Sequence, residues 1–273
     1  MKEVLYFAHA NSFPASVYRK MLTALGAWFQ TEWLDTVGHD PLYPVSDCWP
    51  HLVEETIAAI ERLGEGPVWG VGHSLGGVLI FYAAVKRPDL FRGIVVLDAP
   101  LLSPWRARSI WLAKRLGFIA RVTPGGNTLK RRDCWASVDM VFDYFQRKPM
   151  FARFDTDCLR DYAEYGTVAD TQGDRRLKFR PQIEHNIYCS MPHDTARYAD
   201  RLQVPGCYLA AAEAPVFQPR DRNYAATRLR LEVGEQAGSH LFPLERPLDT
   251  AAAIHVAIER LAAWHVPEPS GRK

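Results

Sequence analysis

The chain has 273 residues, of which 48% are hydrophobic and 23% are charged. This length and composition predict a folded protein with one large core and exclude a disordered chain. A net charge of +2 gives no reason to expect a nucleic-acid partner. No apolar run approaches the roughly 18 residues that span a bilayer, and the N-terminal residues lack the pattern of a secretory signal.

The cysteines are odd in number and scattered, and no two of them form a CxxC pair. This spacing is typical of reduced thiols and gives no sign of a disulfide framework or a zinc site. We therefore expect a cytoplasmic protein that has no metal or other cofactor and no stable association with a membrane. The five are Cys48, Cys134, Cys158, Cys189 and Cys207.

Apolar runs of strand type alternate with helical spacing over the first hundred residues. The run at 93–98 is rich in β-branched residues, as in a parallel strand that is covered on both faces. This alternation predicts a parallel, doubly wound α/β sheet. Strands are expected at 3–8, 29–35, 67–71 and 93–98, with helices at 16–28, 49–63 and 78–85.

Residues 101–200 interrupt this alternation and predict an inserted helical cap. The sheet pattern then resumes at 204–211 and 227–233, and a last helix is expected from about 248 to 264. The expected organisation is a core domain of residues 1–100 and 201–273 with a cap of residues 101–200. Helices of the cap are expected at 105–119, 136–145 and 158–165.

The predicted cap differs in charge from the rest of the chain. It holds 17 Lys and Arg against 12 Asp and Glu, a net +5, while the remainder holds 16 against 19, a net −3. A solvated surface is the simpler reason for this excess. An anionic substrate, such as an acyl group that carries a phosphate, is the alternative.

The segment Gly72-His73-Ser74-Leu75-Gly76 fits the pattern G-x-S-x-G between a predicted strand and a predicted helix. A serine in such a tight turn projects its hydroxyl away from the sheet. Glycines on either side lack a Cβ, which lets the strand and the helix approach closely. The start of the helix also presents backbone N–H groups to a developing negative charge. A glycine-rich turn without chemistry is the alternative.

Two further segments accompany this turn: His9-Ala10-Asn11 before it and Gly238-Ser239-His240 after the last predicted strand. Together and in this order, the three segments resemble those of α/β-hydrolase-fold serine hydrolases over nearly the whole chain. The resemblance implies an esterase-like enzyme with a helical lid, in which Ser74 is the nucleophile and His240 is the base. It also implies an oxyanion hole made by the backbone N–H groups of Leu75 and Asn11.

The acid of the implied triad departs from the common pattern. The family usually places it after the strand that follows the lid, and the proline of that strand leads here to Ala214, which cannot orient an imidazole. The other position in this fold follows the strand after the serine turn, and the glycine of that strand leads to Asp98. We favour Asp98, with Glu213 as the alternative acid and Asp221 as a further one.

The resemblance implies an acyl-enzyme reaction on a small or medium apolar ester or thioester. Phe13, His73 and Trp135 are expected to contact this small-molecule substrate. C–C bond hydrolases and cofactor-free haloperoxidases share the scaffold, and some members only bind ligands, so these alternatives stay open. His9-Ala10-Asn11 is also similar to a haloalkane dehalogenase segment, but those enzymes need a carboxylate where this chain has Ser74.

A second departure concerns the start of the sheet. The family usually opens with a β-hairpin, whereas the first strand here is expected almost at residue 3. The sheet should therefore lack about two strands and present a different edge. A second subunit could cover this edge, so a homo-oligomer is one expectation.

Overall fold

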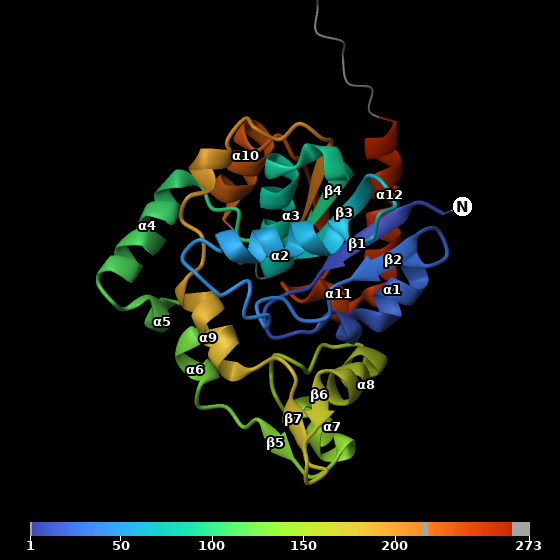
Figure 1. Cartoon of the computed structure of the whole chain (residues 1–273), viewed down its shortest axis with the longest axis vertical. Coiled ribbons are helices and arrows are strands. Elements are labelled where there is room, and N and C mark those ends of the chain that lie inside the picture. The colour runs from blue at the N-terminus through green and yellow to red at the C-terminus, as the bar shows by residue number, and fades with distance from the viewer. Residues whose placement is uncertain (1, 214–217, 264–273) are drawn as a thin grey trace, which may run out of the picture.

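A six-stranded sheet forms the centre of the molecule in the computed structural model, which describes residues 2–213 and 218–263 (Figure 1). All its strands run parallel, in the order β2-β1-β3-β4-β8-β9. The predicted parallel α/β sheet is thereby confirmed. The strands are β1 (Val4–Ala8), β2 (Gln30–Trp33), β3 (Val68–His73), β4 (Phe91–Leu97), β8 (Gly206–Ala211) and β9 (Glu232–Gln236).

Helices cover both faces of the sheet and bury two hydrophobic cores. Successive side chains of a strand point to opposite faces, so Ile94 and Val96 enter one core and Val95 and Leu97 enter the other. The helices of the first face are α2 (Pro50–Glu61), α3 (Leu75–Lys86) and α10 (Pro219–Arg228), and those of the second are α1 (Arg19–Leu25), α11 (Phe242–Glu245) and α12 (Pro247–Ala262).

Among the described residues, no hairpin precedes β1 in the sheet, as the sequence predicts. Strand β1 pairs with β3 on one side and with β2 on the other. Among the described residues, β2 has no second neighbour and forms one edge of the sheet. Its residues are all half-buried or exposed. Coverage of this edge by a second subunit stays a prediction.

The last strand begins later in the chain than predicted. The alternation at 227–233 belongs to the end of α10 and a short link, and β9 starts only at Glu232. Leu229 and Leu231 are buried, but they belong to the link between α10 and β9. Arg230 between them has a φ of 59°, which is not a strand conformation. Strand β9 itself is an edge strand with little apolar pattern, which is why the period-2 signal appeared in the link.

The insertion between β4 and β8 contains strands that the sequence analysis did not predict. Three short strands form an antiparallel sheet in the order β5-β7-β6. Figure 1 shows the insertion along the left and lower sides of the molecule. Its elements are α4 (Pro104–Arg115), α5 (Ile119–Val122), α6 (Gly125–Thr128), β5 (Cys134–Trp135), α7 (Val138–Gln146), α8 (Thr156–Tyr165), β6 (Thr167–Ala169), β7 (Arg175–Leu177), α9 (Pro181–Cys189) and η3 (Thr195–Tyr198).

Two 3-10 helices, η1 (Ala15–Tyr18) and η2 (Pro88–Leu90), complete the described elements, and α8 packs against η1. No helix in the described parts of the chain is both long and apolar enough to cross a membrane. Ala214, and Trp264 at the predicted end of the last helix, lie outside the described residues.

Candidate active site

Ser74 occupies the turn between β3 and α3. Its backbone has a φ of 53° and a ψ of −113°, a conformation that costs free energy for a residue with a Cβ. The surrounding contacts enforce it, because the Ser74 N–H donates to the carbonyl of Leu97 on the neighbouring strand at 2.9 Å, and the Ser74 carbonyl accepts from Gly77 at 3.1 Å.

Two glycines make this turn sterically feasible. A Cβ on Gly72 would lie 2.3 Å from the carbonyl oxygen of Gly76, and a Cβ on Gly76 would lie 2.1 Å from that of Ala8. Both contacts are with backbone atoms, which cannot move aside without separating β1, β3 and α3. The pattern G-x-S-x-G therefore has a packing cause here.

His240 lies between Ser74 and Asp98. Its Nδ1 is 2.6 Å from Oδ2 of Asp98, and its Nε2 is 3.1 Å from Oγ of Ser74. A carboxylate only accepts hydrogen bonds, so Nδ1 carries the proton and Nε2 presents its lone pair to the serine hydroxyl. The three side chains come from the ends of β3 and β4 and from the loop after β9.

The backbone holds Asp98 in place at the end of β4. Its side chain is fully buried, its φ is 38°, and its N–H donates to the carbonyl of Leu209 at 2.9 Å. The second carboxylate oxygen, Oδ1, accepts from the N–H of Ala211 at 3.2 Å. Both oxygens of this buried carboxylate therefore have donors, as a buried charge requires.

The other two acids that the sequence suggested lie elsewhere. The side chain of Glu213 is half exposed and forms an ion pair with Arg153 at 2.8 Å. Asp221 is buried at the start of α10, where it accepts from the N–H of Ser103 at 2.9 Å and pairs with Arg106. The structure does not bring either carboxylate to the imidazole of His240.

The loop that carries His240 is tied down by its own neighbours. Gly238 has a φ of 117°, which favours glycine, and the N–H of Ser239 donates to Glu245 at 2.9 Å. The N–H of Phe242 donates back to the carbonyl of Ser239 at 2.9 Å. This turn places His240 two residues before the start of α11.

The resemblance implied two backbone N–H groups as oxyanion donors, those of Leu75 and Asn11. Leu75 is the first residue of α3, and Asn11 lies in the turn after β1. In the described parts of the chain, neither N–H has a hydrogen-bond acceptor. The first N–H groups of a helix have no partner within the helix, so the Leu75 donor is available by construction.

The side chains of His9 and Asn11 have other bonds. The Nε2 of His9 accepts from the N–H of Val37 at 2.9 Å, and its Nδ1 donates to the carbonyl of Ala10 at 2.9 Å. Burial lowers the pKa of His9 to about 4. The amide of Asn11 donates to the carbonyl of Glu184 on α9 at 3.1 Å, which joins the turn after β1 to the insertion.

His73, which was expected to contact substrate, is fully buried next to Ser74, and both of its ring nitrogens are engaged in hydrogen bonds within the protein. Its Nε2 donates to the backbone carbonyl of His240 at 2.8 Å, and its Nδ1 accepts from the hydroxyl of Tyr18 at 2.8 Å. The same hydroxyl accepts from the N–H of Ala10 at 3.4 Å. No local sequence pattern marks Tyr18, so this chain of bonds could not be predicted from the sequence.

Of the other two residues expected to contact substrate, Phe13 lines a cavity and Trp135 is not among the residues that line this cavity. Phe13 follows the turn after β1 and lines a cavity of about 500 Å³ between this turn and the insertion. Trp135 is buried within the insertion, with its ring centroid 5.4 Å from those of Tyr144 and Phe145. It supports the cavity wall from behind.

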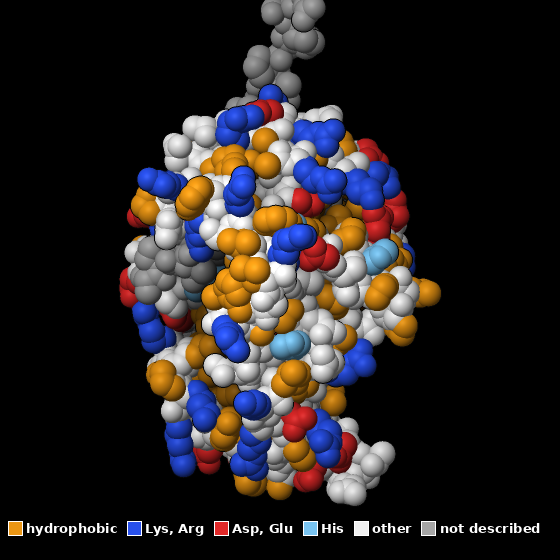
Figure 2. All heavy atoms as spheres, turned by 90° about the vertical axis from the view of Figure 1, so that its left-hand side faces the viewer, with side chains coloured by type: hydrophobic (Ala, Val, Ile, Leu, Met, Phe, Trp, Pro, Cys, Tyr) orange, Lys and Arg blue, Asp and Glu red, His pale blue; other side chains and the backbone are white. Residues whose placement is uncertain are grey.

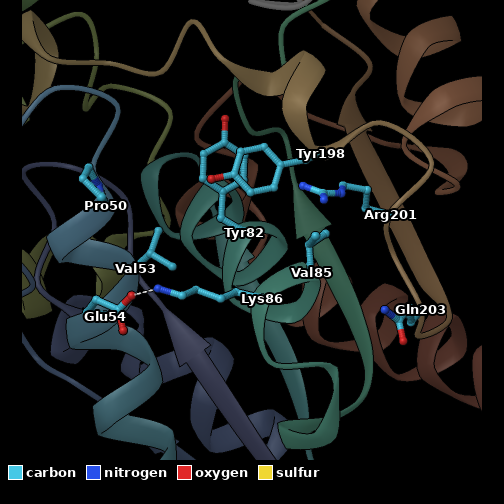
Figure 3. A pocket seen from close by; sticks show the side chains of 9 residues that line it. All are labelled: Pro50, Val53, Glu54, Tyr82, Val85, Lys86, Tyr198, Arg201 and Gln203. Atoms are coloured by element: carbon cyan, nitrogen blue, oxygen red, sulfur yellow. Dashed lines mark hydrogen bonds and ion pairs between the residues drawn. The ribbon is translucent and has the colours of Figure 1, made fainter.

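A separate hollow of about 340 Å³ lies over α2 and α3 (Figure 3). Tyr82 and Tyr198 stack at its rim with ring centroids 3.8 Å apart, and Glu54 pairs with Lys86. None of the residues grouped around Ser74 lines this hollow.

Two clusters in the described residues have the chemistry of metal ligands, and neither of them includes Ser74, His240 or Asp98. In the first, formed by Asp47, Cys48 and His193, the ammonium of Lys114 pairs with Asp47 and lies 3.1 Å from Nδ1 of His193. In the second, Cys134, Asp170 and Asp174, the guanidinium of Arg176 pairs with Asp170 at 2.9 Å. Lysine and arginine thus already supply positive charge to these groups.

Comparisons with known proteins agree with this architecture. No curated protein sequence matches the chain. Several solved structures are similar to the chain. They include E-2-(acetamidomethylene)succinate hydrolase, with a TM-score of 0.72 and 21% identity over 94% of this chain and 91% of that one. The thioesterase domain from the curacin biosynthetic pathway has a TM-score of 0.63 and 14% identity, over 93% and 91% of the two chains.

The enol-lactonase from Burkholderia xenovorans LB400 also has a TM-score of 0.63 with 14% identity, over 95% of this chain and 92% of that one. At these identities the likeness concerns the fold. The sequence profile of the "Alpha/beta hydrolase family" matches residues 5–253, which include β1, the Ser74 turn, the insertion and the His240 loop. The chain therefore belongs to the alpha/beta hydrolase family.

Proposed function

We propose that the chain is a serine hydrolase that cleaves a carboxylic ester or thioester through an acyl-enzyme on Ser74. One observation carries this proposal. The imidazole of His240 makes hydrogen-bonding contact with Ser74 on one side, at 3.1 Å, and with the buried carboxylate of Asp98 on the other, at 2.6 Å. A serine hydroxyl is a weak nucleophile, and an adjacent base in the correct tautomer is what activates it.

In the proposed acylation, Oγ of Ser74 attacks the substrate carbonyl carbon and Nε2 of His240 takes the hydroxyl proton. Asp98 holds the imidazole in position and stabilises the positive charge that forms on it. The N–H groups of Leu75 and Asn11 stabilise the oxyanion. The imidazolium then gives its proton to the departing alkoxide or thiolate, which leaves the acyl group on Ser74.

Deacylation reverses these roles. His240 takes a proton from a water molecule, the resulting hydroxide attacks the acyl carbonyl, and the proton returns to Oγ of Ser74 as the acid departs.

Each N–H group of the proposed oxyanion hole is worth about 10²–10³ in turnover. Helix α3 adds the positive end of its dipole at Leu75.

Among the similar structures, the thioesterase domain and the enol-lactonase are named for cleavage of a thioester and of a cyclic ester. These names fit the proposed reaction, and the hydrolase named for a succinate derivative shows that the same fold serves other substrates. C–C bond cleavage, perhydrolysis of haloperoxidase type and ligand binding without turnover are the competing functions. The complete set of serine, base and acid favours catalysis over binding alone.

The test is covalent labelling combined with turnover. The unmodified protein should react with a fluorophosphonate probe and hydrolyse short p-nitrophenyl esters, and peptide mapping should find the adduct on Ser74. Ser74→Ala should abolish both. Ser103, which donates to Asp221, supplies the matched control, because Ser103→Ala should be labelled as fast as the unmodified protein.

Labelling that persists in Ser74→Ala would remove this serine as the nucleophile. Labelling of Ser74 without turnover of any ester or thioester would keep the nucleophile but reject the proposed reaction. Product analysis with β-diketones, and bromination assays with peroxide, would then separate the C–C hydrolase from the haloperoxidase alternative.

A further inference from the structure

The cavity between the turn after β1 and the insertion begins next to a proposed oxyanion donor. Ser12 and Phe13 line it, and they directly follow Asn11. Glu184 also lines it, and the carbonyl of Glu184 accepts the side-chain amide of Asn11 at 3.1 Å. One wall of the cavity is therefore fixed to the loop that presents the Asn11 N–H.

Aromatic rings form the inner part of the cavity. The ring centroid of Phe13 lies 5.6 Å from that of Tyr162, and the centroid of Phe151 lies 5.0 Å from Tyr162 and 4.7 Å from Phe145. These three pairs are tilted, and Phe145 and Tyr162 meet edge to face, which are favourable arrangements for aromatic rings. Such a surface suits an alkyl chain or a ring and offers it little hydrogen bonding.

The lining also carries three cations and one acid. Arg131, Arg132 and Lys148 are the cations, and Glu184, which is only 4% exposed, is the acid. Glu184 pairs with Arg131 at 2.7 Å, so two positive charges remain after this pairing. In Figure 2, Lys and Arg side chains gather with hydrophobic ones over the lower part of the molecule, which the insertion forms.

The cations are held at defined places. The ammonium of Lys148 lies 4.5 Å from the ring centroid of Tyr144, and the guanidinium of Arg132 lies 5.7 Å from the same centroid. Attraction between a cation and an aromatic face keeps both groups at the cavity. Among the described residues, the Nε of Arg131 is buried without an acceptor, although an unpartnered buried donor is costly.

We propose that this cavity binds an amphipathic substrate with an anionic end, a carboxylate or a phosphate, and an apolar segment between that end and the scissile ester. In the proposed complex, the apolar segment lies against Phe13 and Phe151. The carboxylate or phosphate at the anionic end lies at Arg132 and Lys148, near Arg131. This inference rests on the proposed hydrolase function, because it places the scissile carbonyl at Ser74. It explains why the excess positive charge lies on the insertion.

The test uses pairs of p-nitrophenyl esters with equal chain length. One member of each pair is the monoester of a dicarboxylic acid, and the other is the neutral alkanoate; a third series carries a terminal phosphonate. We expect kcat/KM to be about tenfold or more higher for the anionic member at the preferred length, the size of one charge-assisted hydrogen bond. The preference should shrink with salt, because the cations lie near solvent. The carboxylate and phosphonate series show which oxyanion the cavity prefers.

The double variant Arg132→Gln, Lys148→Gln should lose this preference, so that the ratio of kcat/KM for the anionic ester to kcat/KM for the neutral ester falls from about tenfold to about one. Arg147→Gln is the matched control, because Arg147 is an exposed cation beside Lys148 that does not line the cavity. It should keep the preference. A double variant that retains the full preference would overturn the inference.

Equilibrium binding separates this inference from the proposed function. The Ser74→Ala protein should bind the anionic ester about tenfold more tightly than the neutral one in calorimetry, and the added Arg132→Gln and Lys148→Gln changes should remove the difference. Equal binding of both esters would overturn the inference. The proposed hydrolase function would still hold in that case if the unmodified protein hydrolyses esters and is labelled on Ser74. Preferential binding of the anion without hydrolysis or labelling supports the cavity and rejects the hydrolase.

Discussion

Replacement of Asp98 by asparagine tests the proposed triad most directly. In the structure, Oδ2 of Asp98 accepts from Nδ1 of His240 and Oδ1 accepts from the N–H of Ala211. An asparagine has one acceptor and one donor end, so it can satisfy only one of these two donors. Its two orientations have different consequences for His240.

With the amide oxygen towards His240, the NH₂ group of the asparagine faces the N–H of Ala211, and two buried donors oppose each other. This costs about 1–3 kcal/mol, which favours the reverse orientation by about 10- to 100-fold. In the reverse orientation the NH₂ group donates to Nδ1, so the proton of His240 moves to Nε2. An imidazole in this tautomer cannot accept the proton of Ser74.

The loss of the carboxylate charge beside the imidazolium adds to this tautomer effect. We therefore expect Asp98→Asn to lower kcat for p-nitrophenyl esters by about 10⁴-fold, as for other triads in which the aspartate is replaced. The rate of fluorophosphonate labelling should fall in parallel, since it needs the same proton transfer. Circular dichroism and thermal melting check that the variant is folded.

Glu213→Gln is the matched control. Glu213 is half exposed and pairs with Arg153 at the surface, so its neutralisation should change kcat by less than about twofold, because exposed ion pairs contribute little. A loss of several orders of magnitude in Glu213→Gln, with activity retained in Asp98→Asn, would refute the assignment of the acid.

Two further changes probe the buried support of the site. Tyr18→Phe removes the hydroxyl that joins Ala10 to His73; we expect urea unfolding to show a loss of about 1–3 kcal/mol, and kinetics to show a lower kcat with KM nearly unchanged. Burial lowers the pKa of His9 to about 4, so below the ordinary value of 6.5 the unfolded chain takes up a proton that the folded chain refuses. The free energy of unfolding should therefore fall by about 2 kcal/mol from pH 7 to pH 5 through His9 alone, and His9→Gln should flatten this dependence in urea titrations at the two pH values.

The sequence was sufficient for the centre of the sheet because those strands are buried on both faces. The run that became β4 reads as a continuous β-branched stretch, and the motif around Ser74 fixes the next turn. Edge strand β9 has no such run, and its solvent-exposed residues give no period. The same reason hides the insertion's small sheet, whose strands have only two or three residues each.

The choice between Asp98 and Glu213 was harder for a geometric reason. Both residues follow parallel strands whose carboxyl ends meet at one edge of the sheet, β4 and β8. Which carboxylate turns towards His240 depends on the backbone just after each strand. At Asp98 the φ of 38° and the hydrogen bond to the carbonyl of Leu209 set the direction of the side chain. Neither the backbone angle nor this bond can be predicted from the local sequence.

The residue next to Ser74 in the sequence, His73, has hydrogen bonds that fix its tautomer. Its Nε2 must donate to the carbonyl of His240 while its Nδ1 accepts from Tyr18, so only one tautomer satisfies both bonds. Burial, together with the positive charge that His240 can carry, lowers the pKa of His73 well below its ordinary value. Both ring nitrogens of His73 thus have hydrogen-bond partners other than Ser74, although the two residues are adjacent in the chain. Its two bonds link Tyr18 of η1 to the loop of His240, and Tyr18 in turn accepts from the N–H of Ala10 after β1.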